Sequence, residues 1–198
     1  MTSRRHLLVA LVLVGSACSG GAGAPDAPDP VRCPLGDPSA TPMLEITHLD
    51  AAFQMSTTQP GSQVPLVFPP QGGWILLLGA RATNLDGCRV DLTTSIRDVG
   101  GSTVLSLDRR PTQLDDTGDG WGLTTVTTYG NLPVCPLAAP TRDLHDQPYE
   151  VTVELEDADG KHASKTITVT PVCPDPDPTG LCLCQCDQNY VLGSCPPP

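Results

Sequence analysis

The chain has 198 residues, a formal net charge of −11 at neutral pH and only 4% aromatic residues. This negative charge repels the phosphates of nucleic acids and the head groups of anionic lipids, so nucleic-acid binding is disfavoured. The 22 prolines and 19 glycines argue against long helices and favour many turns, and the scarcity of aromatic residues means that a core must come mainly from Val, Leu and Ile.

The first 17 residues, MTSRRHLLVALVLVGSA, have the three parts of a secretory signal peptide. Arg4 and Arg5 form a basic region, an apolar run extends from Leu7 to Val14, and small residues lead to Cys18. The run is too short to span a bilayer, which takes about 20 apolar residues. We therefore expect residues 1–17 to be removed on export, which moves the formal charge from −11 to −13.

The residues GSAC that end at Cys18 resemble the lipobox of bacterial lipoproteins, although Gly15 stands where that family usually has Leu, Val or Ile. The resemblance implies that Cys18 is lipidated and becomes the mature N-terminus; a plain signal-peptidase site near Ala17 is the alternative. Ser19, beside the acylated residue, implies by the same resemblance that the protein proceeds to the outer membrane. Residues 18–42 begin with a Gly, Ala, Pro and Asp-rich stretch and are expected to form a flexible tether.

From residue 43 to residue 172 the sequence consists of short alternating or apolar runs bounded by turn residues. Alternation with period two places one face of a strand on a core, and β-branched residues suit that setting. We therefore predict a single all-β domain over residues 43–172, a β-sandwich of about seven strands. The runs are MLEITHL, GWILLLGARAT, CRVDLTTSIRDV, STVLSLD, WGLTTVTTY, PYEVTVELED and HASKTITVTPV.

The last two runs flank the turn sequence DADG and predict a β-hairpin. Val151, Val153 and Leu155 fall on one face of the first strand, and Ile167 and Val169 supply the facing side of the second. The hairpin resembles the last two strands of immunoglobulin-like domains, which implies an immunoglobulin-like sandwich. A longer stretch, PPQGGWILLLGARATNLDGCRVDL followed by the hairpin, is similar to a group of predicted myxobacterial lipoproteins that has no established activity.

Nine cysteines leave an even number once Cys18 is assigned to the lipid, and an even number is typical of disulfides in an exported chain. We expect residues 173–198 to form an irregular, disulfide-rich tail, because the CLCQC segment lacks the CxxC spacing of zinc sites. In an extended segment Cys182, Cys184 and Cys186 would point to the same face, so their partners are expected elsewhere, with the pairing left open. Binding of a soft metal such as cuprous copper is an alternative role for these thiols. The disulfide candidates are Cys33, Cys88, Cys135, Cys173, Cys182, Cys184, Cys186 and Cys195.

The segment LDDTGDGWG, residues 114–122, is similar to the start of a calcium-binding loop, with Asp115, Thr117 and Asp119 at alternate positions. An EF-hand loop is completed by a glutamate at its twelfth position, and that position, counted from Asp115, holds Val126. A plain Asp/Gly turn before a strand is therefore favoured, and an irregular calcium site is the alternative.

The sequence has no catalytic signature: it contains no HExxH, no GxSxG and no glycine-rich phosphate loop. Trp121 is a candidate platform for a sugar, whereas Trp74 opens an apolar strand and is expected to pack in or beside the core. We therefore expect a non-catalytic cell-envelope lipoprotein, held at the membrane by its lipid, that serves as a binding or structural module for an unknown envelope protein or glycan. Calcium or carbohydrate binding at the cell surface and metal binding by the tail are the alternatives.

Overall fold

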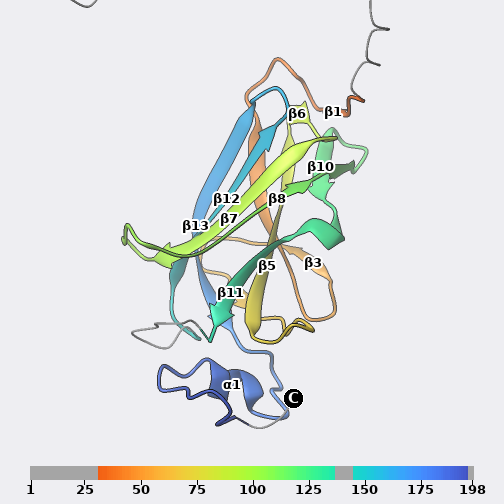
Figure 1. The fold of residues 1–198 in the computed structure, drawn as a ribbon. Coiled ribbons are helices and arrows are strands. Elements are labelled where there is room, and N and C mark those ends of the chain that lie inside the picture. The colour runs from red at the N-terminus through yellow and green to blue at the C-terminus, as the bar shows by residue number, and fades with distance from the viewer. Residues whose placement is uncertain (1–30, 137–144, 196–198) are drawn as a thin grey trace, which may run out of the picture. The chain divides into compact units, whose positions relative to one another are not determined.

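Two packed β-sheets form the body of the protein in the computed structural model, which describes residues 31–136 and 145–195 (Figure 1). The strands of the first sheet are β2 (Met43–Leu49), β3 (Met55–Thr57), β5 (Trp74–Thr83), β9 (Leu114–Asp116), β10 (Trp121–Thr124) and β11 (Gly130–Cys135). The strands of the second sheet are β4 (Gln63–Pro65), β7 (Val90–Asp98), β8 (Val104–Thr112), β12 (Tyr149–Asp157) and β13 (His162–Val172). The other described elements are β1 (Pro34–Leu35), β6 (Leu85–Asp86), the 3₁₀ turn η1 (Val126–Thr128) and the helix α1 (Leu181–Gln185).

The strand order is that of an immunoglobulin-like sandwich. The first sheet has the order β3–β2–β5–β10–β9, with β11 paired to another part of β5, and the second has the order β4–β13–β12–β7–β8. The chain passes from β5 in one sheet to β7 in the other and returns for β10 and β11, so that β12 lies between β7 and β13 as in that fold. The expected all-β sandwich with a disulfide-rich C-terminal tail is confirmed.

The core follows the alternation of the sequence. Val151, Val153, Leu155 and Val169 are fully buried and Ile167 is 6% exposed, as the hairpin pattern predicts. Residues of β12 and β13 pair in register through the whole hairpin, with Val151 opposite Ile167. Within β5, Leu77 and Arg81 are half-buried and all other residues are buried, and β5 pairs with β2 along one edge and with β10 and β11 along the other.

One run differs from the prediction, and the structure adds one strand. WGLTTVTTY is a strand only as far as Thr124 and then turns through η1, where Thr128 N donates to Thr125 O. The strand β11 begins directly after this turn and was not predicted, since GNLPVC contains Gly, Asn and Pro, which are depleted in strands. β10 and β11 both pair antiparallel with β5, along different parts of its length, like one strand that is interrupted by a turn.

The folded unit begins at Val31, earlier than the expected boundary at residue 43. β1 pairs with β6, Leu35 is only 2% exposed, and Cys33 forms a disulfide with Cys88. These contacts hold residues 33–35 of the expected tether on the sandwich.

The expected signal peptide (residues 1–17), the lipidation site Cys18 and the first part of the tether lie outside the described residues. Within the described residues, no helix has both the length and the apolar character that crossing a bilayer requires.

Candidate functional site

Two buried disulfides hold α1 in place, one to the sandwich and one to the residue that directly follows β13. Cys182 pairs with Cys173, which directly follows β13, and Cys186 pairs with Cys135 at the end of β11. The remaining tail disulfide joins Cys184 to Cys195, and with Cys33–Cys88 all eight candidate cysteines are paired.

The segment CLCQC is helical rather than extended, because residues Leu181–Gln185 form α1 and Cys186 is its C-cap. Residues four apart lie on the same face of a helix, and Cys182 and Cys186 are both buried against the core. Cys184, halfway between them in the sequence, is half-buried and bonded within the tail. Each cysteine of the motif therefore has a different partner, as expected, but through helical rather than extended spacing.

A second covalent joint lies at the other end of β5. The Cys33–Cys88 disulfide is supported by Asp86, whose Oδ1 accepts hydrogen bonds from the backbone N–H groups of Cys33 and Cys88, both at 3.0 Å. Arg32 Nη1 lies 3.4 Å from Asp86 Oδ2. Partial burial works to raise the pKa of Asp86, but the hydrogen bonds from Cys88 and Cys33 and the charge of Arg32 outweigh it and hold the pKa below its usual value. Both oxygens of the Asp86 carboxylate thus already contact groups of the protein.

Sequence reasoning did not find this joint. Cys88 N donates a hydrogen bond to the carboxylate of Asp86, two residues earlier, and this contact forms an Asx turn. The order Asp-Gly-Cys at residues 86–88 is typical of such a turn and could have indicated it. The pairing with Cys33 had no local signal, because 55 residues separate the two cysteines.

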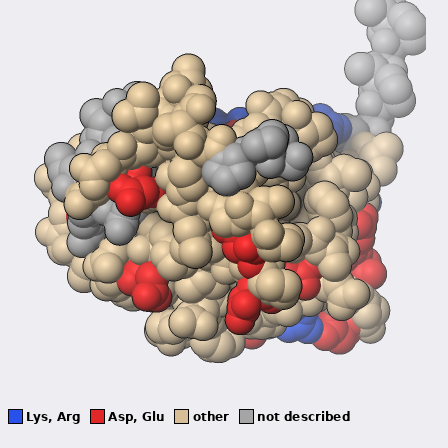
Figure 2. Space-filling model, turned by 90° about the horizontal axis from the view of Figure 1, so that it is seen from below, with Lys and Arg blue, Asp and Glu red and all other residues tan. Residues whose placement is uncertain are grey.

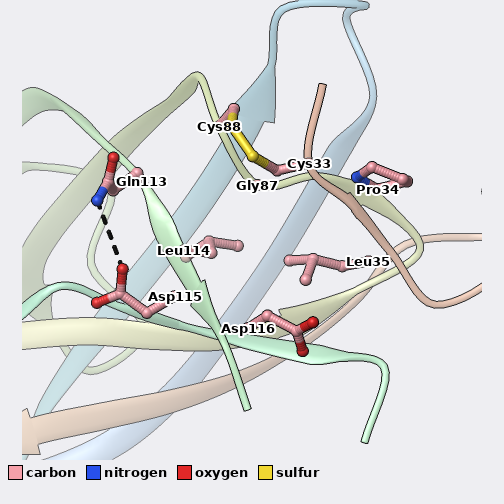
Figure 3. Close-up of a pocket in the computed structure, with 9 residues that line it drawn as sticks. All are labelled: Cys33, Pro34, Leu35, Gly87, Cys88, Gln113, Leu114, Asp115 and Asp116. Carbon is pink, nitrogen blue, oxygen red and sulfur yellow. Dashed lines mark hydrogen bonds between the residues drawn. A yellow bond between two sulfur atoms is a disulfide. The ribbon is translucent and has the colours of Figure 1, made fainter. Parts of the chain in front are cut away.

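A pocket of about 440 Å³ opens beside this disulfide, between β1, the turn that joins β6 to β7, and β9 (Figure 3). Figure 3 shows Leu35 and Leu114 pointing toward each other, with Asp116 on the same side of β9 and Asp115 on the opposite side. This alternation is that of any strand. Gln113 Nε2 donates to Asp115 Oδ1 at 3.4 Å. The pocket thus combines two leucine side chains with the carboxylate of Asp116 on the same side of β9.

The expected calcium residues form the turn of the β9–β10 hairpin and are bonded to protein groups. Asp119 Oδ1 accepts hydrogen bonds from Thr117 Oγ1 at 2.6 Å and from Trp121 N at 3.1 Å, and Arg81 forms an ion pair with Asp119 Oδ2. The hydrogen bond from Thr117 is the main cause of a lowered pKa at Asp119. Asp115 Oδ2 instead accepts from Thr125 Oγ1 at 3.0 Å.

Two groups of His, Cys, Asp or Glu side chains in the described residues bring three potential ligand atoms within 4.8 Å of one another. They are Cys173 with Cys182 and Cys186, and Cys33 with Asp86 and Cys88. Neither group includes Asp115 or Asp119; of the expected calcium residues, Thr117 and Asp119 lie side by side, whereas Asp115 is bonded to Thr125.

The two tryptophans differ in the way the sequence suggests. Trp74 is 7% exposed and packs against Phe68, with the ring centroids 5.1 Å apart. Trp121 is half-buried, and the guanidinium of Arg81 lies 4.5 Å from the centre of its ring. This cation–π contact occupies one face of the ring that a sugar would need.

The three histidines of the described residues differ in their exposure and contacts. His48 is buried and shares a 2.9 Å hydrogen bond between its Nδ1 and Thr58 Oγ1. Burial lowers the pKa of His48, and the nearby Asp50 opposes this effect only in part. His162 is exposed and His145 is half-exposed.

No protein-family model matches the chain, and no curated protein matches its sequence.

Proposed function

We propose that the protein is a non-catalytic module of the cell envelope, exported and attached to a membrane through lipid on Cys18. The observation that carries the proposal is the pairing of all eight described cysteines in four disulfides. Structural disulfides form and persist in oxidising compartments outside the cytoplasm. They support export, and the export signal with its lipobox-like GSAC sequence supports attachment.

The sandwich serves as a binding or structural unit for another envelope component. Acidic side chains are spread over the end of the molecule that carries α1, with little basic surface beside them (Figure 2). The tail itself, residues 173–198, contains Asp175, Asp177 and Asp187 but no Lys or Arg. A partner with a neutral or basic surface fits this charge, and a nucleic acid does not.

Lipid attachment is tested by metabolic labelling with palmitate in a Gram-negative host. The wild-type chain is expected to incorporate label and to sediment with membranes, whereas a Cys18→Ser variant loses both. A Ser19→Ala variant is the matched control and keeps the label. Label that persists in Cys18→Ser would refute attachment at this residue.

The binding role is tested by site-specific photocrosslinking in intact envelopes. A crosslinker at Leu183, which is exposed on α1 at the acidic end, is compared with one at Thr166, which lies in β13. A specific adduct from Leu183 alone would assign the acidic end to the partner. Absence of adducts from both positions in a membrane-attached protein would contradict the use of this surface.

A further inference from the structure

A disulfide-closed loop in the tail presents two large apolar side chains to solvent. The Cys184–Cys195 bond closes this loop, with a sequence separation of 11. Leu192 is 90% exposed, the highest value among the large apolar side chains of the described residues, and its neighbour Val191 is 66% exposed. Because single exposed leucines are common on protein surfaces, the way in which this pair is held and surrounded decides its meaning.

A turn holds the apolar pair at the tip of the loop. Ser194 N donates to Val191 O at 2.9 Å, and Gly193, the third residue of this turn, has a φ of +83°. A glycine with positive φ at that position is typical of a type II turn. Leu192 is therefore the second residue, at the corner of the turn, which accounts for its exposure.

A second turn and the disulfide hold the base of the loop. Asp187 O accepts a hydrogen bond from Tyr190 N at 2.9 Å, and Asp187 Oδ1 accepts one from Asn189 N at 2.7 Å. The disulfide ties the far end of the loop to α1, because Cys184 belongs to that helix. A loop that is held in this way loses less conformational entropy on docking than a free segment with the same side chains.

The surroundings of the loop are acidic. Residues 173–198 contain three aspartates and no Lys or Arg, and one of the three, Asp187, is an exposed residue of the loop itself. Figure 2 shows acidic side chains spread over this end of the molecule. Such a surface repels anionic lipid head groups and a second copy of the same loop, and it attracts Lys and Arg side chains. Segments that lie on membranes depend on basic residues around their apolar side chains, and the tail has none.

We propose that Val191 and Leu192 are the anchor residues of the binding module, and that they insert into an apolar pocket, bordered by Lys or Arg side chains, on another protein of the cell envelope. This inference rests on the proposed function and specifies the contact surface and the chemistry of the partner. Burial of a leucine side chain in such a pocket strengthens binding by about 10- to 100-fold.

The test begins with a photoreactive side chain at Ser194, which is exposed and close to Leu192 in the chain, in the membrane-attached protein. A covalent adduct with one envelope protein is expected, at a partner residue that lies beside apolar and basic side chains. An adduct with lipid, or with a second copy of this chain, would overturn the proposal. Absence of an adduct at Ser194, while a crosslinker at Leu183 captures a protein, would also overturn it and would leave the proposed function standing.

An affinity measurement then identifies the anchor, because a crosslink shows proximity alone. The partner found by crosslinking is purified and titrated with the full mature chain. Leu192→Ser is expected to weaken binding by about 10- to 100-fold, the effect of losing one buried leucine. Leu107→Ser is the matched control and should leave the affinity unchanged, because Leu107 is a 59% exposed leucine in β8. Equal affinities of Leu192→Ser and the wild type would refute the anchor role.

Two further measurements examine the fold and the charge. The melting temperature of Leu192→Ser should equal that of the wild type, since a side chain that is 90% exposed makes few packing contacts, and a lower value would contradict a solvent-exposed anchor. Raising NaCl from about 0.05 M to about 0.5 M should weaken wild-type binding, because salt screens the attraction between the aspartates and a basic border. Binding that salt leaves unchanged would contradict the basic border.

Discussion

Removal of the Cys33–Cys88 disulfide is expected to destabilise the sandwich more than removal of the Cys184–Cys195 disulfide of the tail. The bond closes a loop of 55 residues in sequence separation, and none of the other three disulfides lies within or across that loop. Restriction of the unfolded chain by such a loop contributes about 4 kcal/mol to the free energy of unfolding in the chain-entropy model. The Cys184–Cys195 bond, with a separation of 11, contributes about 3 kcal/mol at most by the same estimate.

The assay is thermal unfolding by far-UV circular dichroism under non-reducing conditions, with a Cys33→Ala/Cys88→Ala variant and a Cys184→Ala/Cys195→Ala control. For a chain of this size, about 4 kcal/mol lowers the melting temperature by about 8–16 °C. Both variants remove both sulfurs, so neither carries a free thiol that could exchange. A control that melts at or below the temperature of the Cys33/Cys88 variant would refute the loop-length reasoning.

Three further predictions follow from buried groups and from the β9–β10 turn. Gly79→Ala is expected to cost about 1–3 kcal/mol in urea unfolding, since its Cβ would lie 2.7 Å from the buried ring of Tyr129; an unchanged midpoint would contradict this packing. The lowered pKa of His48 means that the unfolded chain takes up the proton first as the pH falls below about 6.5, so stability should fall with acidification in that range. His48→Asn, which keeps a partner for Thr58, should flatten this part of the pH profile, and an unaltered slope would assign it to other groups. Millimolar calcium should leave the melting temperature unchanged because both Asp119 oxygens are engaged; a rise that disappears in an Asp119→Ala variant would establish a cation site.

Most of the sandwich was predictable because its strands carry strong alternation. MLEITHL and HASKTITVTPV coincide with β2 and β13 from first to last residue. Local sequence predicted the secondary structure less well where the identity of a residue is fixed by a contact with a distant part of the chain. Gly130 lies at the start of β11 and not in a turn. The absence of a side chain is needed there because a Cβ would lie 2.4 Å from Oγ1 of Thr94 in the opposite sheet.

The four disulfides show the same difference between what the local sequence predicts and what depends on contacts between distant segments. The even number of cysteines predicted disulfides correctly, but partners depend on the packing of strands far apart in the sequence. For the tail, the sequence left open whether the side chains repeat with the period of a strand or of a helix. Cys182 and Cys186 share a face in both cases, whereas Cys184 joins them only in a strand. The helix directs Cys184 to Cys195 instead of to the core.

The Cys33–Cys88 bond also determines how mechanical force enters the sandwich. A pull on the chain that precedes Cys33 reaches Cys88 through the disulfide before it acts on β1, which has only two residues paired with β6. Cys88 leads directly into β7, which is hydrogen-bonded to β8 on one side and to β12 on the other. Tension is therefore transferred past the weak N-terminal strand into an interior strand, where two hydrogen-bonded neighbours share it.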